Sequence, residues 1–149
     1  MISKNNKIFL AGHNGMAGSA ILKKLKNTGY KNIICVSKKK LNLLDQKKVE
    51  NFLKKKKPKV VIIAAARVGG ILANNNNKAS FLYENLTIQT NIIHGSYLAG
   101  VKNLIFLGSS CIYPKKTKQP IKEAFFMTGP LENTNDAYAI AKIAGVKMC

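Results

Sequence analysis

The stretch Phe9-Leu10-Ala11-Gly12-His13-Asn14-Gly15-Met16-Ala17-Gly18 lies near the start of the chain and decides the fold. An apolar run ends there in three glycines spaced three residues apart, and an amphipathic run over 19–26 follows. This order predicts a strand, a tight turn and the beginning of a helix. Gly12 would permit the turn, Gly15 would let the backbone approach a pyrophosphate, and Gly18 would let the helix pack closely on the strand. A helix N-terminus attracts phosphate groups, so this context favours a dinucleotide site over a glycine turn without a ligand.

The composition is that of a globular protein with a core of its own. Hydrophobic residues make up 46% of the 149 positions. No apolar run approaches the ~20 residues of a transmembrane helix, and the polar residues 1–7 lack the apolar centre of a signal peptide. The cysteines Cys35, Cys111 and Cys149 are few and widely spaced. We therefore expect a reducing cytoplasm, no membrane association, no disulfide framework and no metal site.

The formal net charge of +19, from 25 basic and 6 acidic residues, raises the question of nucleic-acid binding. Arg67 is the only arginine, although the planar guanidinium is the group that reads phosphate and guanine with two hydrogen bonds. The lysines are spread along the chain and are interrupted by asparagine-rich stretches such as Asn74–Asn77. We therefore expect loose, salt-sensitive adhesion to nucleic acid and no specific partner of that class.

Apolar runs alternate with helical patterns along the chain. The expected strands cover about 7–11, 32–37, 60–64 and 104–107, and the expected helices cover about 16–27, 46–55, 80–98 and 136–149. Asp45 is a candidate N-cap and Gly29 a candidate helix end, and the segments 67–78 and 112–135 are expected to be loops. Uniformly apolar strands predict a parallel sheet covered by helices on both faces. We expect a Rossmann-like, doubly wound α/β fold with strand order 3-2-1-4.

The end of the chain indicates an unfinished domain. The last helical pattern stops at Lys147-Met148-Cys149 without a capping glycine or proline. The fourth strand would then form an open apolar edge, which is an aggregation hazard unless something covers it. We expect residues 1–149 to form an NAD(P)-binding Rossmann-like domain that is truncated after the last helix, with the substrate-binding domain absent.

A second group of polar residues suggests proton transfer. Tyr138 and Lys142 lie four apart on a predicted helix and share one face. Alone this pair could be a chance surface feature, but Ser109 or Ser110 at the end of the fourth strand can bind a substrate carbonyl at the edge where such sheets hold ligands. We expect the ammonium group to lower the pKa of the phenol. Cys111 could be an acid or base, or a small buried apolar residue.

The segment after the second strand bears on the choice of cofactor. Ser37-Lys38-Lys39-Lys40 follows that strand, and no carboxylate occurs before Asp45. An acidic residue there would bind the ribose 2′-hydroxyl of NAD, whereas a cation suits the 2′-phosphate of NADP. The lysines therefore favour NADP, although a solvated lysine run would look the same. Asn14 could add a phosphate contact within the glycine turn.

Taken together, these motifs closely resemble those of the GDP-L-fucose synthases, which are extended short-chain dehydrogenases/reductases. The segments that carry the resemblance are Ala11–Gly18, Leu41–Asp45, Ala64–Ile71, Ala73–Asn75, Gly108–Pro114 and Tyr138–Gly145. The resemblance runs along the whole chain and covers about the first half of a typical family member. It differs at Asn14 and near Lys38, where the family often has arginine.

The resemblance implies an activity and a set of catalytic roles. Members are NADPH-dependent 3,5-epimerase/4-reductases of GDP-4-keto-6-deoxymannose. Cys111 would move protons at C3 and C5 together with a histidine of the second half, which neither His13 nor His94 matches. Tyr138 would then protonate the C4 oxygen. Finally, the resemblance implies that Ser109 holds this oxygen and that Lys142 tunes the tyrosine and binds the nicotinamide ribose.

The resemblance also implies a cofactor site and an assembly. The implied NADPH-binding residues are Gly12, His13, Asn14, Gly15, Met16, Ala17, Gly18, Lys38, Asn42, Leu43, Ala64, Ala65, Ala66, Leu107, Gly108 and Lys142. A homodimer that uses the long helix and the last helix is expected, and 149 residues alone are expected to give no turnover. The alternatives are another NAD(P)-dependent nucleotide-sugar epimerase or dehydratase and a cofactor-binding fragment without catalysis.

Overall fold

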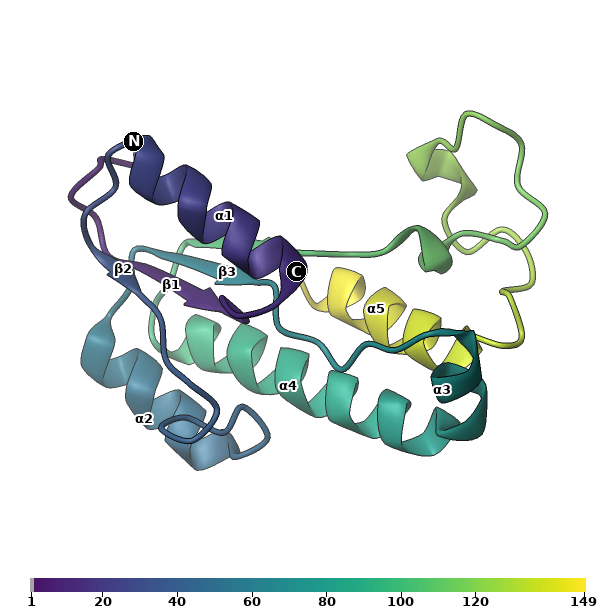
Figure 1. The fold of residues 1–149 in the computed structure, drawn as a ribbon, viewed down its shortest axis with the longest axis horizontal. Coiled ribbons are helices and arrows are strands. Elements are labelled where there is room, and N and C mark those ends of the chain that lie inside the picture. Colours follow the sequence, from purple (N-terminus) through teal and green to yellow (C-terminus); the bar gives the residue numbers. More distant parts are fainter. Residues whose placement is uncertain (1) are drawn as a thin grey trace. The chain divides into compact units, whose positions relative to one another are not determined.

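Four short parallel strands form one sheet in the computed structural model, which describes residues 2–149 (Figure 1). The chain divides into two compact units. The sheet belongs to the first unit, which contains residues 2–66, 87–107 and 149, and the second unit contains residues 67–86 and 108–148.

The strand order in the first unit differs from the expected one. The strands are β1 Ile8–Ala11, β2 Ile33–Ile34, β3 Val60–Ile63 and β4 Asn103–Phe106. They are arranged as β2-β1-β3-β4, so the predicted order 3-2-1-4 is wrong. The parallel, Rossmann-like character of the sheet is confirmed.

Burial explains why β3 takes the inner position. Every residue of β3 is buried, as every residue of β1 is, and the two strands pair along their full length. Only Ile33 and Ile34 of the apolar run over 32–37 pair with β1, and both are only half-buried. A short, partly exposed strand is tolerated at a sheet edge, whereas a strand buried along its whole length requires neighbours on both sides.

Helices cover both faces of this sheet. Helix α1, Met16–Asn27, packs on the face formed by Ile8, Leu10, Val60 and Ile62. Helix α2, Gln46–Lys56, and residues 87–98 of helix α4, Lys78–Leu98, pack on the opposite face (Figure 1). Alternate residues of the two central strands therefore enter two separate apolar cores, one on each side of the sheet.

The predicted helix boundaries in this unit are confirmed at three points. Helix α1 begins and ends where the sequence pattern predicts. Gly29 follows its last turn with φ +86°, a left-handed conformation that glycine adopts without strain. Asp45 is the N-cap of α2, and its carboxylate accepts a hydrogen bond from the backbone N–H of Lys48 at 3.0 Å.

The second unit contains a helix that the sequence pattern does not predict. Helix α3, Ile71–Asn76, lies within the expected loop 67–78, so that expectation is wrong. Asn74 causes the difference, because its side-chain amide donates to the carbonyls of Gly69 and Gly70 at 2.8 and 3.1 Å. Asparagine disfavours helices when its side chain competes for the backbone, but here that side chain closes the first turn.

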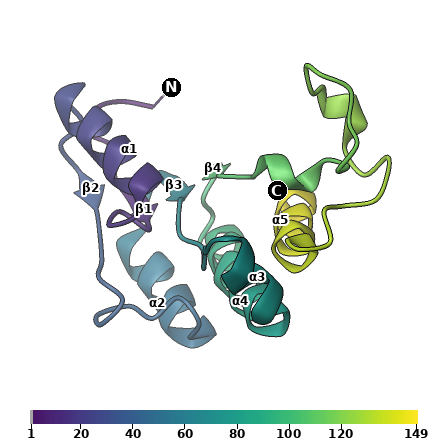
Figure 2. The ribbon, with the colours of Figure 1, turned by 45° about the vertical axis from the view of Figure 1, so that its right-hand side comes forward.

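A long connection in the second unit leads to the last helix. It passes through two short 3₁₀ turns, η1 Ser110–Ile112 and η2 Glu123–Phe125, and ends at helix α5, Asp136–Met148 (Figure 2). The Lys78 ammonium, at the start of α4, lies 2.9 Å from the Asp136 carboxylate and also donates to the Asn133 carbonyl. This lysine therefore fixes the beginning of α5.

Two further expectations concern the surface. Strand β4 forms an open edge of the sheet, as predicted, and Ile105 on it is 52% exposed. Within residues 2–149, no helix is both long enough and apolar enough to cross a bilayer.

Candidate functional site

The glycine turn is fixed by two steric contacts within the first unit. Gly12 has φ +87°, and a Cβ atom there would lie 2.5 Å from the backbone nitrogen of Ala65. A Cβ atom at Gly18 would lie 2.0 Å from the carbonyl oxygen of Gly12. Only glycine fits at either position, because real Cβ atoms do not approach backbone atoms so closely. The predicted roles of Gly12 in the turn and of Gly18 in helix packing therefore agree with the structure.

Gly15 has no such steric reason within the described residues 2–149. The one heavy atom within 4 Å of a Cβ built there is the Gly12 carbonyl oxygen, at an ordinary 3.5 Å. Gly15 is the N-cap of α1, so no side chain caps the free N–H groups of the helix from that position. The first turn also carries no acidic residue. Asn14, Gly15 and Met16 are exposed. The helix N-terminus is thus open to a phosphate group, and these residues fit a dinucleotide.

Other predicted cofactor residues follow the carboxyl ends of the parallel strands. Ala11, Ile63 and Phe106 are aligned across the sheet, so the residues after β1, β3 and β4 leave it at one edge. These are the glycine turn with His13 and Ala17, the small residues Ala64, Ala65 and Ala66, and Leu107. The Gly12 turn packs against the backbone of Ala64 and Ala65, which leaves no room for a Cβ atom at residue 12.

The segment between β2 and α2 contains the remaining predicted cofactor residues of this unit. Lys38 is exposed in a turn, in which the backbone N–H of Lys40 donates to the Ser37 carbonyl. The Asn42 side chain accepts from the Leu44 N–H at 3.2 Å, and the Leu43 carbonyl accepts from a side chain of α4. Lys38 is therefore available to an anion, whereas Asn42 shapes its own turn.

The four predicted catalytic residues lie together in the second unit, where η1 packs against α5. The Ser109 side chain forms a hydrogen bond with Tyr138 and accepts one from the Cys111 backbone N–H at 3.3 Å. The Lys142 ammonium lies 5.7 Å from the centre of the Tyr138 ring. Gly108, an exposed residue, precedes this group along the chain. The structure thus brings a hydroxyl, a thiol, a phenol and an amine into one cluster.

The pKa of Tyr138 shifts in the opposite direction from the expected one. Burial of the phenol raises its pKa above 10.0, the neighbouring Cys111 raises it further, and the hydrogen bond with Ser109 partly opposes both. The expected net lowering of this pKa is therefore wrong, because removal of the phenol from water dominates. At neutral pH Tyr138 is therefore protonated, and its phenol can donate a hydrogen bond.

Lys142 is the one buried lysine among residues 2–149, with 4% of its surface exposed. Burial lowers its pKa from 10.5 to about 8, because the ammonium form loses hydration. A lysine in this range is mostly charged at pH 7 but can release its proton under mildly basic conditions.

Sequence analysis did not identify one residue of this cluster. The side-chain amide of Asn135 donates to the Cys111 sulfur at 2.8 Å. Asn135 immediately precedes α5, where asparagine indicates a helix cap and nothing more. Its place three residues before Tyr138 is the signal that could have marked it.

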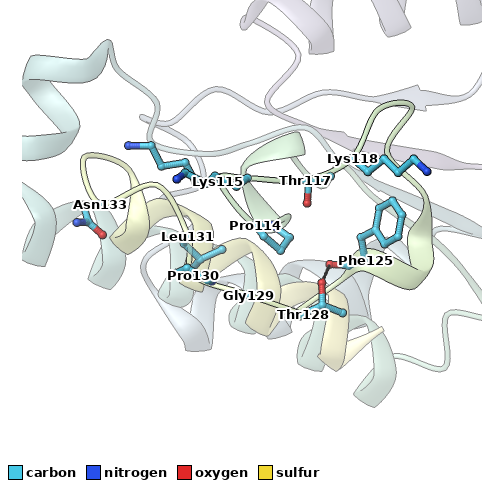
Figure 3. Close-up of a pocket in the computed structure, with 11 residues that line it drawn as sticks. Pro114, Lys115, Thr117, Lys118, Phe125, Thr128, Gly129, Pro130, Leu131 and Asn133 are labelled. Atoms are coloured by element: carbon cyan, nitrogen blue, oxygen red, sulfur yellow. Dashed lines mark hydrogen bonds between the residues drawn. The ribbon is translucent and has the colours of Figure 1, made fainter.

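A separate cavity of about 510 Å³ lies within the long connection of the second unit (Figure 3). Its shape depends on local contacts, such as the hydrogen bond from the Thr128 hydroxyl to the Phe125 carbonyl at 2.9 Å. The residues that line it are Pro114, Lys115, Lys116, Thr117, Lys118, Phe125, Thr128, Gly129, Pro130, Leu131 and Asn133. None of the predicted site residues lines it. Within residues 2–149, no cluster of three or more His, Cys, Asp or Glu side chains could hold a metal ion.

Comparison with known proteins places these motifs in context. The model of the NAD dependent epimerase/dehydratase family matches residues 8–149. The chain is 54% identical over 149 residues to GDP-L-fucose synthase 1 of Arabidopsis thaliana, covering 100% of this chain and 46% of that protein. It is 49% identical over 143 residues to GDP-L-fucose synthase of Escherichia coli K12, covering 96% of this chain and 44% of that protein. The chain thus spans less than half the length of these curated relatives.

A solved structure is similar along the whole chain. It is a GDP-D-glycero-L-gluco-heptose synthase from Campylobacter jejuni, determined in the presence of NADPH. The TM-score is 0.96 at 41% identity, and the match covers 100% of this chain and 44% of that one. The predicted Rossmann-type fold and the predicted kinship with nucleotide-sugar reductases are both confirmed.

The steric contacts predict different effects for two glycine substitutions. Gly18→Ala places a methyl group against the Gly12 carbonyl and should lower the free energy of unfolding by about 3 kcal/mol or prevent folding. The methyl group of Gly15→Ala meets no close atom. Because alanine is a slightly poorer N-cap than glycine, this substitution should lower the free energy of unfolding by less than about 1 kcal/mol. Urea denaturation followed by circular dichroism measures both. An equal decrease in the free energy of unfolding for both variants would contradict the view that Gly15 is needed for ligand binding and not for packing.

The burial of Lys142 predicts a pH-dependent stability. Between the folded pKa of about 8 and the ordinary value of 10.5, the unfolded chain binds more protons, so unfolding becomes harder as pH rises. Lys142→Met should therefore be more stable than the parent chain at pH 7, on the order of 1 kcal/mol, and this advantage should shrink as pH rises to 10. Urea denaturation at several pH values measures the difference, with Lys122→Met as an exposed control. A constant difference would contradict the burial argument.

Proposed function

The chain belongs to the NAD dependent epimerase/dehydratase family, and from this membership we propose that it is the cofactor-holding part of a GDP-L-fucose synthase. The reaction is the NADPH-dependent 3,5-epimerisation and 4-reduction of GDP-4-keto-6-deoxymannose. The clustering of Ser109, Cys111, Tyr138 and Lys142 carries the proposal. In this proposal both units belong to one incomplete NAD(P)-binding domain over residues 1–149, which acts in the cytoplasm as part of a homodimer.

The first unit supplies the binding of the dinucleotide. The space beside Gly15 and the open N-terminus of α1 suit a pyrophosphate. The exposed Lys38 follows β2, where the ribose of the adenosine half is bound in such folds, and its charge suits the 2′-phosphate of NADP. The similar Campylobacter jejuni protein was solved in the presence of NADPH, which supports the same choice of cofactor.

The second unit supplies the groups that handle protons at the C4 oxygen. NADPH, when bound, is the source of the hydride that reduces C4. Because Tyr138 is protonated at neutral pH, its phenol can donate a hydrogen bond to the C4 oxygen and give it a proton as hydride arrives at C4. Ser109 binds Tyr138 and can share this oxygen, so negative charge there meets two hydroxyl donors. Lys142 lies close enough to the tyrosine ring to stabilise the phenolate left behind.

Epimerisation requires a second kind of proton transfer. A ketone at C4 makes the hydrogens at C3 and C5 acidic, because the C4 oxygen holds the charge of the resulting enolate. Cys111 lies beside the residues that bind this oxygen, so its thiolate can take a proton from an adjacent carbon. Inversion needs an acid on the opposite face, and neither His13 nor His94 matches the histidine that the family uses. The proposal therefore predicts that residues 1–149 bind NADPH without catalysing epimerisation.

Two other functions fit parts of the same site. A related reductase of a GDP-4-keto sugar is supported by the 41% identity to the heptose synthase. A cofactor-binding fragment without catalysis is supported by the chain's short length relative to its relatives. Incubation with NADPH and GDP-4-keto-6-deoxymannose tests the expected lack of turnover, because GDP-L-fucose formed by residues 1–149 would contradict both that expectation and a fragment without catalysis.

Cofactor binding provides the direct test. We expect NADPH to bind at least about tenfold more tightly than NADH, measured by fluorescence titration at physiological salt. Lys38→Glu should remove most of this preference, because a carboxylate repels the 2′-phosphate. Gly15→Ala should weaken both cofactors about tenfold, because its methyl group enters the space for the pyrophosphate.

The control for charge alone is Lys47→Glu, which changes an exposed lysine of α2 by the same amount. It should leave the preference intact. A parent chain that binds NADH as tightly as NADPH would contradict the proposed function and favour an NAD-dependent relative.

A further inference from the structure

Asn135 occupies the cap position of α5 but does not cap the helix with its side chain. Its carbonyl accepts the N–H of Ala139 at 3.0 Å, which makes it the residue that precedes the first turn. At this position an asparagine oxygen ordinarily accepts an N–H from the helix. The side chain that bonds to this turn is instead that of Asp136, whose carboxylate accepts the Ala137 N–H at 2.7 Å.

The amide of Asn135 is directed at Cys111 instead. Its nitrogen donates to the sulfur at 2.8 Å, and its oxygen is buried without a hydrogen-bond partner among the described residues 2–149. A buried amide oxygen without a partner is destabilising, and so is the loss of a cap. Helix stability therefore does not explain this orientation, whereas a requirement at the thiol does.

The surroundings of Cys111 are otherwise fixed. Its backbone N–H is bound to the Ser109 hydroxyl oxygen, and the titratable group that faces it from α5 is Tyr138. Lys142 lies beside that tyrosine on the same helix, and Asp136 at the start of the helix is already paired with Lys78. Among these groups, Asn135 is the one whose side chain donates a hydrogen bond to the sulfur.

We propose that Asn135 is a positioning residue that holds Cys111 in both of its protonation states. This role rests on the proposed function, in which the thiolate takes a proton from carbon and the electrons of the C–H bond remain on the substrate as an enolate. The acid on the opposite face then protonates that carbon, and the thiol releases its own proton to water. The amide N–H donates to the thiolate. After rotation of the amide, its oxygen can accept the S–H of the thiol, because that oxygen gives up no other hydrogen bond.

Alkylation of Cys111 tests this role without requiring catalysis. The 149-residue chain and its variants are treated with iodoacetamide between pH 6 and 10, and each cysteine peptide is quantified by mass spectrometry. Asn135→Asp places a carboxylate beside the sulfur and should move the pH midpoint of Cys111 alkylation upward by about one unit, a tenfold slowing at intermediate pH. Asn135→Ala removes the donor and should cause a smaller upward shift.

Three controls separate this role from a structural one. Asn133→Asp adds the same charge at an exposed position two residues away and should leave the profile unchanged. The exposed Cys149 in the same molecule should alkylate identically in all variants. Asn135→Ser keeps a residue that favours helix caps, so it serves if the other variants fail to fold, and it should behave like the alanine variant.

The result that would overturn the proposal is a folded Asn135→Asp or Asn135→Ser chain whose Cys111 profile coincides with that of the parent chain. The proposed function fails by a different observation, namely absence of NADPH binding by the parent chain. Because the predicted dinucleotide contacts lie largely in the first unit, NADPH binding should be the same in all Asn135 variants, and the two failures remain distinguishable.

Discussion

The first unit depends on the close packing of Gly18 against the carbonyl group of Gly12. It brings the first turn of α1 against the end of β1, at a distance that excludes any side chain at residue 18. Gly12 packs at the same time against the backbone of Ala64 and Ala65 after β3, which excludes a side chain at residue 12. The open helix N-terminus is a consequence of this packing. A fold that needs glycine for its own contacts therefore creates a place for phosphate.

Local patterns made the elements predictable, and their arrangement was harder to derive. The helices α1, α2 and α5 begin where periodicity and capping residues indicate, because these signals act over a few neighbouring residues. The strand order depends on which apolar run is buried on both sides, and the run over 32–37 looks as apolar as β3 although only two of its residues pair. Helix α3 is not predictable from composition, because asparagine ordinarily favours loops, whereas the Asn74 side chain here bonds to the backbone at the start of the helix.

In the site, too, the sequence identified residues but not the properties that depend on packing. Spacing and resemblance identified Ser109, Cys111, Tyr138 and Lys142, and the structure brings them together. The direction of the tyrosine pKa could not be derived from spacing, because it depends on how much water the packed helix excludes. Asn135 was missed for a related reason, since a residue's chemical partner is visible only when distant segments are placed side by side.

The register of the sheet has a consequence for how the chain acquires its structure. Ile8 pairs with Val60, and Val60 pairs with Asn103, so each central pairing closes a loop of roughly forty to fifty residues before it gains any contact. Such non-local topologies fold slowly, and during synthesis β1 leaves the ribosome long before β3 can cover it. Apolar segments are then exposed in many unfinished chains at once. The charge of +19 makes such chains repel one another, which opposes their association through these apolar segments.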